Sequence, residues 1–182
     1  MVLPQTDEEL MRAYVAGDDA SADVLFDRYA GSVYSLMNRY VRNPEQARDL
    51  CQQAFLQIHR ARHDWDPSRA VKPWLFTVAV NVRRDWHRRH VRRPQGHSVG
   101  EAPLEWMPTD GGQEAASEAI RLRNAVGRLP EPLREVIELH WFEGFPMREI
   151  AEMNGLSHSA IKVRAHRAYK LLRTELGDVA DG

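Results

Sequence analysis

The sequence predicts an all-α protein made of two small helical domains joined by a flexible linker. Apolar residues recur at intervals of three and four through most of the 182 residues, which is the spacing of amphipathic helices. We find no segment with the alternating apolar and polar residues typical of strands. Residues 94–113, PQGHSVGEAPLEWMPTDGGQ, contain three prolines and four glycines, a composition typical of a linker. The predicted domains are therefore residues 1–93 and 114–182.

Four helices are predicted in the N-terminal domain. Thr6 and Glu9 form a capping box at the start of a short helix. A second helix covers about residues 21–42, and Pro44 suits the first position of a third. A fourth runs from about Pro73 into an arginine-rich segment. The apolar residues expected in the core are Phe26, Tyr29, Val33, Leu36, Met37 and Tyr40 on the second helix, Ala47, Leu50, Ala54, Phe55 and Ile58 on the third, and Trp74, Leu75, Val78 and Val82 on the fourth.

The C-terminal domain is predicted to contain a helix-turn-helix. Two helices over residues 114–128 and 131–143 precede it. The segment 146–173, PMREIAEMNGLSHSAIKVRAHRAYKLLR, places the small residue Ala151 on one helix and Gly155 in the turn that follows. Two helices that cross at a steep angle need a small residue and a permissive turn at these places. Because such motifs place their second helix in the major groove, this segment predicts nucleic-acid binding.

The second helix of the motif has a predicted buried stripe and a predicted DNA-facing side. Ser157 is suited to the N-cap position. Ile161, Ala165, Ala168 and Leu172 repeat at intervals of four, three and four residues and form the stripe. The remaining positions face away from the domain, with donors for guanine or phosphate and a valine for a thymine methyl group. The candidates for DNA contact are Ser157, His158, Ser159, Lys162, Val163, Arg164, His166, Arg167 and Lys170.

The net charge of −1 conceals two basic segments. Residues 83–93, RRDWHRRHVRR, hold six arginines and one aspartate, and residues 158–173 hold five basic residues and no acidic one. Each segment carries +5, so the remaining 155 residues carry −11. Two basic segments in an otherwise acidic chain indicate two separate contacts with a polyanion. The alternative is that both are solvated helix faces.

Several functional classes are disfavoured. A single cysteine, Cys51, cannot form an intrachain disulfide or a cysteine-only zinc site. It lies eight residues from His59, about 12 Å along a helix axis, which is too far to share an ion. No nucleophile–base pair or phosphate-binding loop is present, so we expect neither enzymatic activity nor a cofactor. No apolar run approaches the roughly 20 residues of a membrane span, and no signal peptide is recognisable, so we expect a cytoplasmic protein.

Three segments of the chain resemble a bacterial sigma factor of the extracytoplasmic-function (ECF) group, the minimal type with only the second and fourth sigma regions. LFDRYAGSVYSLMNRYVRNPEQARDLCQQAFLQIHRA resembles the start of the second region, and KPWLFTVAVNVRRDWHRRHVRR resembles its promoter-reading end. LPEPLREVIELHWFEGFPMREIAEMNGLSHSAIKVRAHRAYKLLR resembles the fourth region. The resemblance covers about residues 7–93 and 114–176. It implies binding to core RNA polymerase, recognition of the −10 and −35 promoter elements, and control by an anti-sigma factor.

The resemblance assigns a polymerase-binding surface to the third helix. In the family, this surface docks on the clamp helices of the largest polymerase subunit. Leu50 and Phe55 also fit a core role. Gln53 stands where the family often has glutamate, which affects the expected affinity for polymerase. The candidates are Asp49, Gln52, Gln53, Phe55 and Leu56.

The resemblance also assigns the −10 element to residues of the second region. HDWDPSRAVKP resembles the loop that captures a flipped base, although it differs from the common glycine-containing version. Extruding a base costs a few kcal/mol, and a pocket for the base lowers that cost. Trp86 suits either stacking on an unpaired base or a place in the core. The candidates are Trp65, Asp66, Ser68, Arg69, Asn81, Arg83, Arg84, Trp86, Arg88 and Arg89.

The sequence therefore favours an alternative sigma factor that binds core polymerase and directs promoter-specific initiation. A second hypothesis is a conventional helix-turn-helix regulator with an N-terminal sensing or interaction domain, but the second basic segment argues against it. A third, a scaffold held by helix–helix contacts, leaves both basic segments unexplained.

Overall fold

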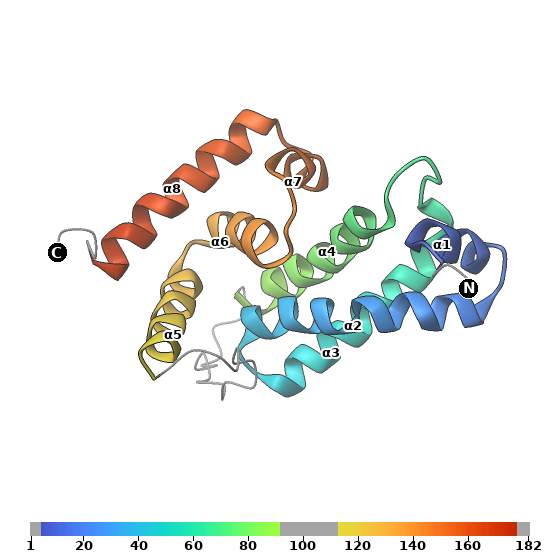
Figure 1. The fold of residues 1–182 in the computed structure, drawn as a ribbon, viewed down its shortest axis with the longest axis horizontal. Helices are drawn as coiled ribbons and strands as arrows, with labels where there is room; N and C mark the ends of the chain where they lie inside the picture. Colours follow the sequence, from blue (N-terminus) through green and yellow to red (C-terminus); the bar gives the residue numbers. More distant parts are fainter. Residues whose placement is uncertain (1–4, 92–112, 178–182) are drawn as a thin grey trace. The chain divides into compact units, whose positions relative to one another are not determined.

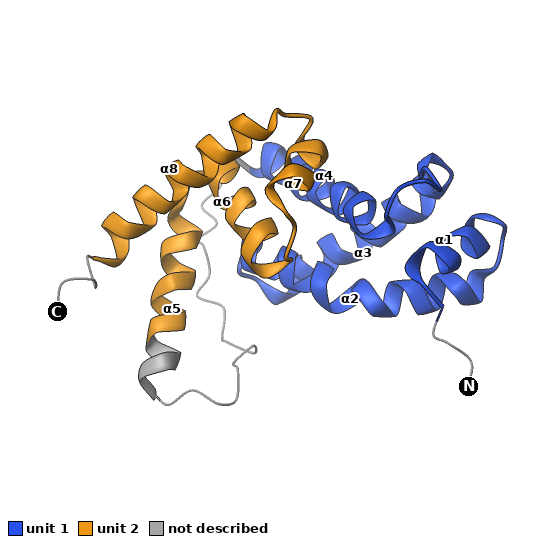
Figure 2. Ribbon diagram, turned by 45° about the horizontal axis from the view of Figure 1, so that its top comes forward, with its two compact units in different colours: residues 1–102 blue, residues 103–182 orange. Residues whose placement is uncertain are grey.

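The computed structural model describes residues 5–91 and 113–177, and every regular element in these ranges is a helix. The chain divides into two compact units, unit 1 (Met1–Ala102) and unit 2 (Pro103–Gly182) (Figure 2). This confirms the prediction of an all-α fold with two helical domains. The predicted linker lies outside the described residues, except for Gln113, where a helix begins.

The described part of unit 1, residues 5–91, contains four α-helices and one short 3-10 helix (Figure 1). Helices that follow each other in the sequence pack side by side. α2 (Asp19–Val41) contacts α1 (Asp7–Val15) and α3 (Pro44–Ala61), and α3 contacts α4 (Val71–Val91). The predicted starts of the first and third helices are confirmed by a Thr6–Glu9 capping box and by Asn43, which caps a helix with Pro44 at its first position. The elements are α1 (Asp7–Val15), α2 (Asp19–Val41), α3 (Pro44–Ala61), η1 (Arg62–Asp64) and α4 (Val71–Val91).

The core of unit 1 follows the predicted stripes on α2 and α3 but not on α4. On α2 and α3, all predicted residues are buried except Phe26 and Phe55, which are half-buried and pack against each other at 4.9 Å. The prediction for α4 was wrong at three of four positions: Trp74, Val78 and Val82 are only half-buried. Nearly every residue from 74 to 80 is apolar, so periodicity does not determine which face turns inward. The buried apolar residues of α4 are Val71, Leu75, Phe76, Ala79 and Val80.

Unit 2 ends in the helix-turn-helix. The single helix predicted over residues 131–143 is instead an α-helix that continues into a π-helical turn. In this turn the Glu143 backbone N–H donates to the Glu138 carbonyl at 3.3 Å, five residues back. The elements are α5 (Gln113–Arg128), α6 (Glu131–Ile137), η2 (Glu138–Phe142), α7 (Met147–Asn154) and α8 (His158–Leu176).

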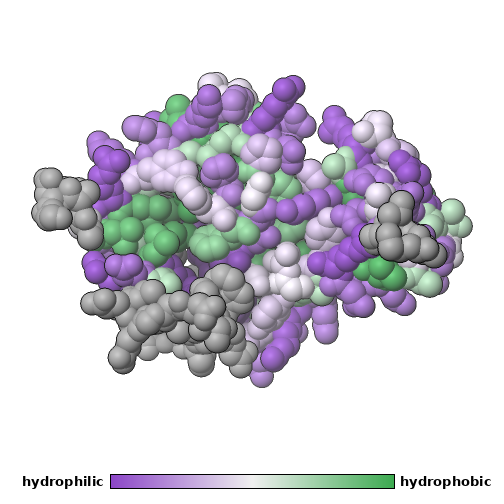
Figure 3. All heavy atoms as spheres, viewed as in Figure 1, coloured by the Kyte–Doolittle hydropathy of each residue, from purple (hydrophilic) through white to green (hydrophobic). Residues whose placement is uncertain are grey.

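A hydrophobic cluster joins α5, α6 and α8 in unit 2. Hydrophobic side chains gather where α5 and α8 approach each other (Figure 3). Leu133, Tyr169 and Leu176 are partly buried at its edge. The cluster determines which side of α8 faces the core of unit 2. It thereby also determines which side of α8 faces solvent. Its buried members are Ala125, Val126, Leu129, Ile137, Ala168 and Leu172.

Candidate nucleic-acid interface

The turn between α7 and α8 has the geometry that a helix-turn-helix requires. Gly155 adopts the left-handed conformation, with φ 62° and ψ 33°, which a residue with a Cβ rarely adopts. The Leu156 N–H donates to the Ala151 carbonyl at 2.9 Å and closes the end of α7. Ser157 then caps α8, because its Oγ accepts from the Ala160 N–H at 3.2 Å. The predicted turn and the predicted N-cap are both confirmed.

The outer side of α8 is exposed and basic. The predicted stripe of Ile161, Ala165, Ala168 and Leu172 is buried, which confirms the phase of the helix. Val163 lies on the opposite side and is 50% exposed. No acidic residue occurs between positions 158 and 173. Of the candidates for DNA contact, Ser157, His158, Ser159, Lys162, Val163, His166, Arg167 and Lys170 are exposed, and Arg164 is half-buried.

The loop between η1 and α4, which we call the 66–70 loop, is exposed between two buried residues. Trp65 is only 5% exposed and Val71 is completely buried. The Asp66 carboxylate accepts hydrogen bonds from the Ser68 N–H at 2.9 Å and from the Ser68 hydroxyl at 2.7 Å. The Arg69 N–H donates to the Asp66 carbonyl at 2.9 Å. The loop is therefore held in one shape by its own polar groups.

The electrostatics of the 66–70 loop follow from these contacts. The backbone hydrogen bond from Ser68, followed by its hydroxyl, lowers the pKa of Asp66, because both bonds favour the carboxylate. Asp66, Ser68 and Arg69 are exposed, as a loop that contacts DNA requires. The predicted contact of Trp65 with the −10 element is not supported, because its indole is almost fully buried. Trp65 instead anchors the start of the loop.

The basic side of α4 contains fewer available arginines than the sequence suggests. Arg83 is completely buried, and its guanidinium lies 4.8 Å from the centre of the Tyr40 ring. The predicted phosphate contact of Arg83 is therefore not supported. Arg83 lies four and seven residues after the buried Ala79 and Phe76, so it shares their inward face of α4.

The other polar candidates on α4 are accessible. Asn81 is exposed, and its side-chain oxygen accepts a hydrogen bond from Arg84 at 3.1 Å. Arg84 is half-buried, whereas Arg88 and Arg89 are exposed. Arg88 forms an ion pair with Asp85 three residues earlier. These contacts hold the polar side chains of α4 close to the helix surface.

Aromatic residues cluster near the end of α4. Trp86 is half-buried and stacks on His90, with ring centres 4.1 Å apart and planes 18° from parallel. The edge of Trp86 meets Tyr40 at 6.1 Å, and the Tyr40 hydroxyl is hydrogen-bonded to His87 Nδ1. Trp86 thus packs partly against α2, as the core alternative held, and stacks on the exposed His90 ring; its stacking on an unpaired base stays a prediction.

The predicted polymerase surface lies on the outer side of α3. Asp49, Gln52 and Gln53 are exposed, and Leu56 is 49% exposed. These positions share one helix face, because they lie three, four and seven residues apart. The half-buried Phe55 borders this face through its contact with α2. Leu50 belongs to the core, as the alternative interpretation held.

Two exposed aromatic residues of unit 2 lie outside the predicted surfaces. Trp141 is 66% exposed and Phe142 is 43% exposed, and both belong to the π-helical turn η2. The Trp141 Nε1–H donates to the Tyr169 hydroxyl at 2.9 Å and so links η2 to α8. Helical periodicity could not identify these positions, because the π turn changes the spacing at this point.

Residues 5–91 and 113–177, the described ranges, contain no group of three or more histidine, cysteine or carboxylate side chains that could hold a metal ion. None of the helices in these ranges is long and apolar enough to cross a bilayer. Cys51 is half-buried, and burial raises the pKa of its thiol. A thiol with a raised pKa is less reactive.

Comparison with known proteins identifies both units. Residues 25–93 match the family model of sigma-70 region 2, and residues 119–172 match that of sigma-70 region 4. The chain is 33% identical over 171 residues to the RNA polymerase sigma factor CarQ of Myxococcus xanthus, covering 93% of this chain and 97% of that protein. It is 32% identical over 179 residues to the ECF RNA polymerase sigma factor SigM of Mycobacterium tuberculosis, covering 98% of this chain and 88% of that protein.

A solved structure has the same fold. CnrH, determined in complex with the cytosolic domain of CnrY, superposes with a TM-score of 0.71 over 97% of this chain and 99% of that chain, at 24% identity. Sigma factors are specificity subunits rather than enzymes, and the matches to both regions exclude a conventional helix-turn-helix regulator. The chain belongs to the ECF group of the sigma-70 family, with regions 2 and 4, and it directs promoter-specific initiation of transcription.

Proposed function

We propose that the two units divide promoter recognition between them. Region 2, within residues 1–93, reads the −10 element, and region 4, within residues 114–182, reads the −35 element. Residues 94–113 connect them. The observation that carries the proposal is the outer side of α8. This side is exposed and basic, has no acidic residue between positions 158 and 173, and lies opposite a buried stripe. Such a helix fits the major groove of DNA.

The division of roles on α8 follows from donor chemistry and exposure. Arg167 and Lys162 donate to guanine or to phosphate, and Val163 contacts a thymine methyl group. His166 lies beside them on the exposed side. Lys170 lies farther along the helix and contacts the DNA backbone, which positions the protein without reading sequence. Ser157, His158 and Ser159 at the start of α8, and Arg164 at its side, complete the surface.

In region 2, the 66–70 loop captures the flipped base of the −10 element. Asp66, Ser68 and Arg69 present polar groups in a fixed arrangement, so little ordering is needed when a base enters. The Asn81 amide reads a base edge. The exposed arginines of α4 neutralise phosphates, and the Trp86–His90 stack offers an aromatic surface to the unpaired strand. The arginines in this role are Arg84, Arg88 and Arg89.

Core RNA polymerase binds the outer side of α3. Asp49 provides a carboxylate and Leu56 an apolar contact on the same exposed face, and this combination suits clamp helices with arginine side chains. Gln52 and Gln53 provide neutral hydrogen-bonding groups between them. The half-buried Phe55 forms the apolar border of the surface.

A cognate anti-sigma factor controls the protein by covering these surfaces. Leu56 in unit 1 and Val163 in unit 2 are about half exposed, and apolar side chains within polar surfaces suit a protein partner. The site of action is the cytoplasm, where core polymerase and promoter DNA meet.

Run-off transcription with purified core polymerase tests the proposed function. We expect promoter-specific transcripts with the wild-type chain and a large loss with Arg167→Ala on a template that has an intact −35 element. On a template whose −35 element has been replaced, the two proteins are expected to give similar low yields. Equal yields of the two proteins on the intact template would exclude the proposed role of α8.

A further inference from the structure

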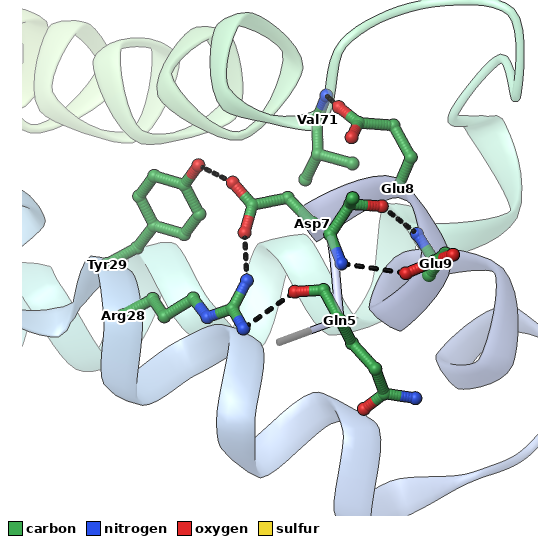
Figure 4. A network of polar contacts seen from close by, with 8 residues as sticks. Gln5, Asp7, Glu8, Glu9, Arg28, Tyr29 and Val71 are labelled. Atoms are coloured by element: carbon green, nitrogen blue, oxygen red, sulfur yellow. Dashed lines mark hydrogen bonds and ion pairs between the residues drawn. The ribbon is translucent and has the colours of Figure 1, made fainter. Parts of the chain in front are cut away.

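The first helix of unit 1 is attached to the start of α4 by a hydrogen bond between residues far apart in the sequence. The Glu8 Oε1 accepts from the Val71 backbone N–H at 3.2 Å (Figure 4). These residues are 63 positions apart. Val71 is the first residue of α4 and directly follows the 66–70 loop. Glu8 also lies outside the match to sigma-70 region 2, which begins at residue 25.

The local sequence explains why the acceptor comes from a distant helix. The first N–H groups of an α-helix have no carbonyl partner within the helix, and a side chain before the helix normally accepts one of them. Ala70 occupies the position before α4 and has no side-chain acceptor. The Glu8 carboxylate replaces this missing local cap, and its negative charge is favoured at the positive end of the helix dipole.

α1 is itself fixed to α2, so the Glu8 carboxylate is held in place. Asp7 forms an ion pair with Arg28 at 2.7 Å and accepts a hydrogen bond from the Tyr29 hydroxyl (Figure 4). Arg28 also donates to the Gln5 carbonyl at 2.8 Å. Farther along α1, Leu10, Met11 and Tyr14 are buried in the core of unit 1.

We propose that Glu8 is a positioning residue for the 66–70 loop, and that α1 thereby determines how the loop presents itself to the −10 element. The loop has two attachments: the buried Trp65 at its start and the Val71 N–H at its end. Glu8 acts on the second attachment. A loop fixed at both ends reaches a flipped base without first being ordered, and this lowers the cost of capture. The inference rests on the proposed role of the loop.

The test compares Glu8→Ala, Glu8→Gln and Glu9→Ala in holoenzyme assembled from the full chain and core polymerase. Glu8→Ala removes the acceptor, whereas Glu8→Gln keeps an oxygen acceptor at the same reach. Glu9→Ala is the matched control, because it removes one half of the capping box of α1 and so weakens that helix without touching Val71. The readouts are core-polymerase affinity and the yield of open complex on two templates, one with the −10 element and one with its flipped base replaced.

We expect Glu8→Ala to lower open-complex yield on the intact template by about threefold to tenfold, the effect of losing one helix cap. The ratio of yields on the two templates should fall, with core-polymerase affinity unchanged. Glu8→Gln should retain most of the open-complex yield and most of the ratio between the two templates. Glu9→Ala should leave this ratio unchanged. An equal fall of the ratio for Glu8→Ala and Glu9→Ala would overturn the proposal, because general weakening of α1 would then explain the result.

Ser68→Ala separates this proposal from the proposed role of the loop. Ser68 is exposed and contacts Asp66 within the loop, so its removal disturbs the loop without touching α1. If Ser68→Ala lowers the ratio but Glu8→Ala does not, the loop reads the −10 element and the positioning role of Glu8 is wrong. If neither variant lowers the ratio, the role of the loop is wrong, and the positioning role is rejected with it.

Discussion

Arg83 and Tyr40 form a buried cation–π pair, with the guanidinium 4.8 Å from the centre of the ring. The pair joins α4 to α2 within unit 1, and the Arg83 side chain has no exposed surface. The first arginine of the basic segment 83–93 therefore stabilises the fold, whereas Arg88 and Arg89 remain accessible to DNA. The same helix carries both roles because positions 83 and 89 lie on different sides of it.

Replacing Arg83 should affect stability rather than DNA binding. We expect Arg83→Ala to lower the free energy of unfolding by about 2 kcal/mol or more, because a desolvated cation–π contact and a packed side chain are lost together. The salt dependence of promoter binding should be unchanged. Arg89→Ala is the control, since it should leave stability unchanged and lower the slope of log affinity against log salt by about one. Urea unfolding and a salt titration measure the two effects. If Arg83→Ala changed the slope of log affinity against log salt, Arg83 would have to contact a DNA phosphate after all.

Unit 2 should lose stability when one partner of the buried Arg134–Glu138 ion pair is removed. Arg134 Nε lies 2.9 Å from Glu138 Oε1, and both side chains are almost fully buried. We expect Arg134→Met to cost about 3–5 kcal/mol, because a buried carboxylate is left without its cation. Replacing both partners by apolar residues should cost less than the single change.

The control for this pair is Arg148→Met. Arg148 forms an exposed pair with Glu152 at 3.8 Å at the same helical spacing, and exposed pairs contribute less than about 1 kcal/mol. Chemical denaturation of each variant gives the comparison. Similar losses for Arg134→Met and Arg148→Met would show that burial does not determine the contribution of the Arg134 pair.

Arg167 and Lys170 should differ in how they affect specificity. We expect Arg167→Ala to weaken binding to the cognate promoter by about 1–3 kcal/mol and to reduce discrimination at one base pair of the −35 element. Lys170→Ala should weaken binding to all sequences by a similar factor, with a lower salt slope. Fluorescence anisotropy with cognate and substituted duplexes at several salt concentrations distinguishes these outcomes. The assignment fails if Arg167→Ala binds the cognate duplex as tightly as the wild type throughout the salt titration.

The family resemblance implies a glutamate at the position of Gln53, so we expect Gln53→Glu to strengthen binding to core polymerase. The added carboxylate lies on the same exposed face of α3 as Asp49. We expect a gain of about 0.2–1 kcal/mol, the range for an exposed ion pair. Gln5→Glu adds the same charge at an exposed position of unit 1 outside α3 and serves as the control. A competition assay for core polymerase measures both, and equal gains would indicate a general charge effect.

Tyr29 should make unit 1 less stable at high pH. Burial, and then the hydrogen bond to Asp7, raise the pKa of its hydroxyl, because both favour the neutral form. The stabilisation is fully present below the ordinary tyrosine pKa of about 10 and is lost as pH rises above it, since only the unfolded chain then ionises. Tyr29→Phe should reduce the fall in urea midpoint between about pH 9.5 and 11.5. The same fall in both proteins would assign the effect to other groups.

Local signals in the sequence were sufficient for the helix ends and for the stripe on α8. The Thr6–Glu9 capping box, the Ser157 N-cap and the left-handed Gly155 each depend on neighbouring residues, so the sequence contains the whole cause. The Ile161 stripe was equally clear, because polar residues occupy the opposite side of that helix.

The errors arose where tertiary packing decides between local alternatives. The apolar run of α4 is compatible with several inward faces, and packing against α2 and α3 selects the one that buries Arg83. The contact between Glu8 and Val71 spans 63 positions, so no local pattern announces it. In the candidate nucleic-acid interface, the sequence therefore indicates which side chains have suitable chemistry. Only the structure shows which of these side chains are exposed.

The π-helical turn η2 contains one more residue per turn than the α-helix before it. This extra residue rotates everything that follows, and Trp141 and Phe142 consequently point to solvent after six consecutive buried positions from 134 to 139. Deleting a single residue from η2 would restore the α-helical spacing and turn a different set of side chains outward. The chemical character of this surface is thus encoded in the length of the chain, so insertions and deletions can remodel it without any substitution.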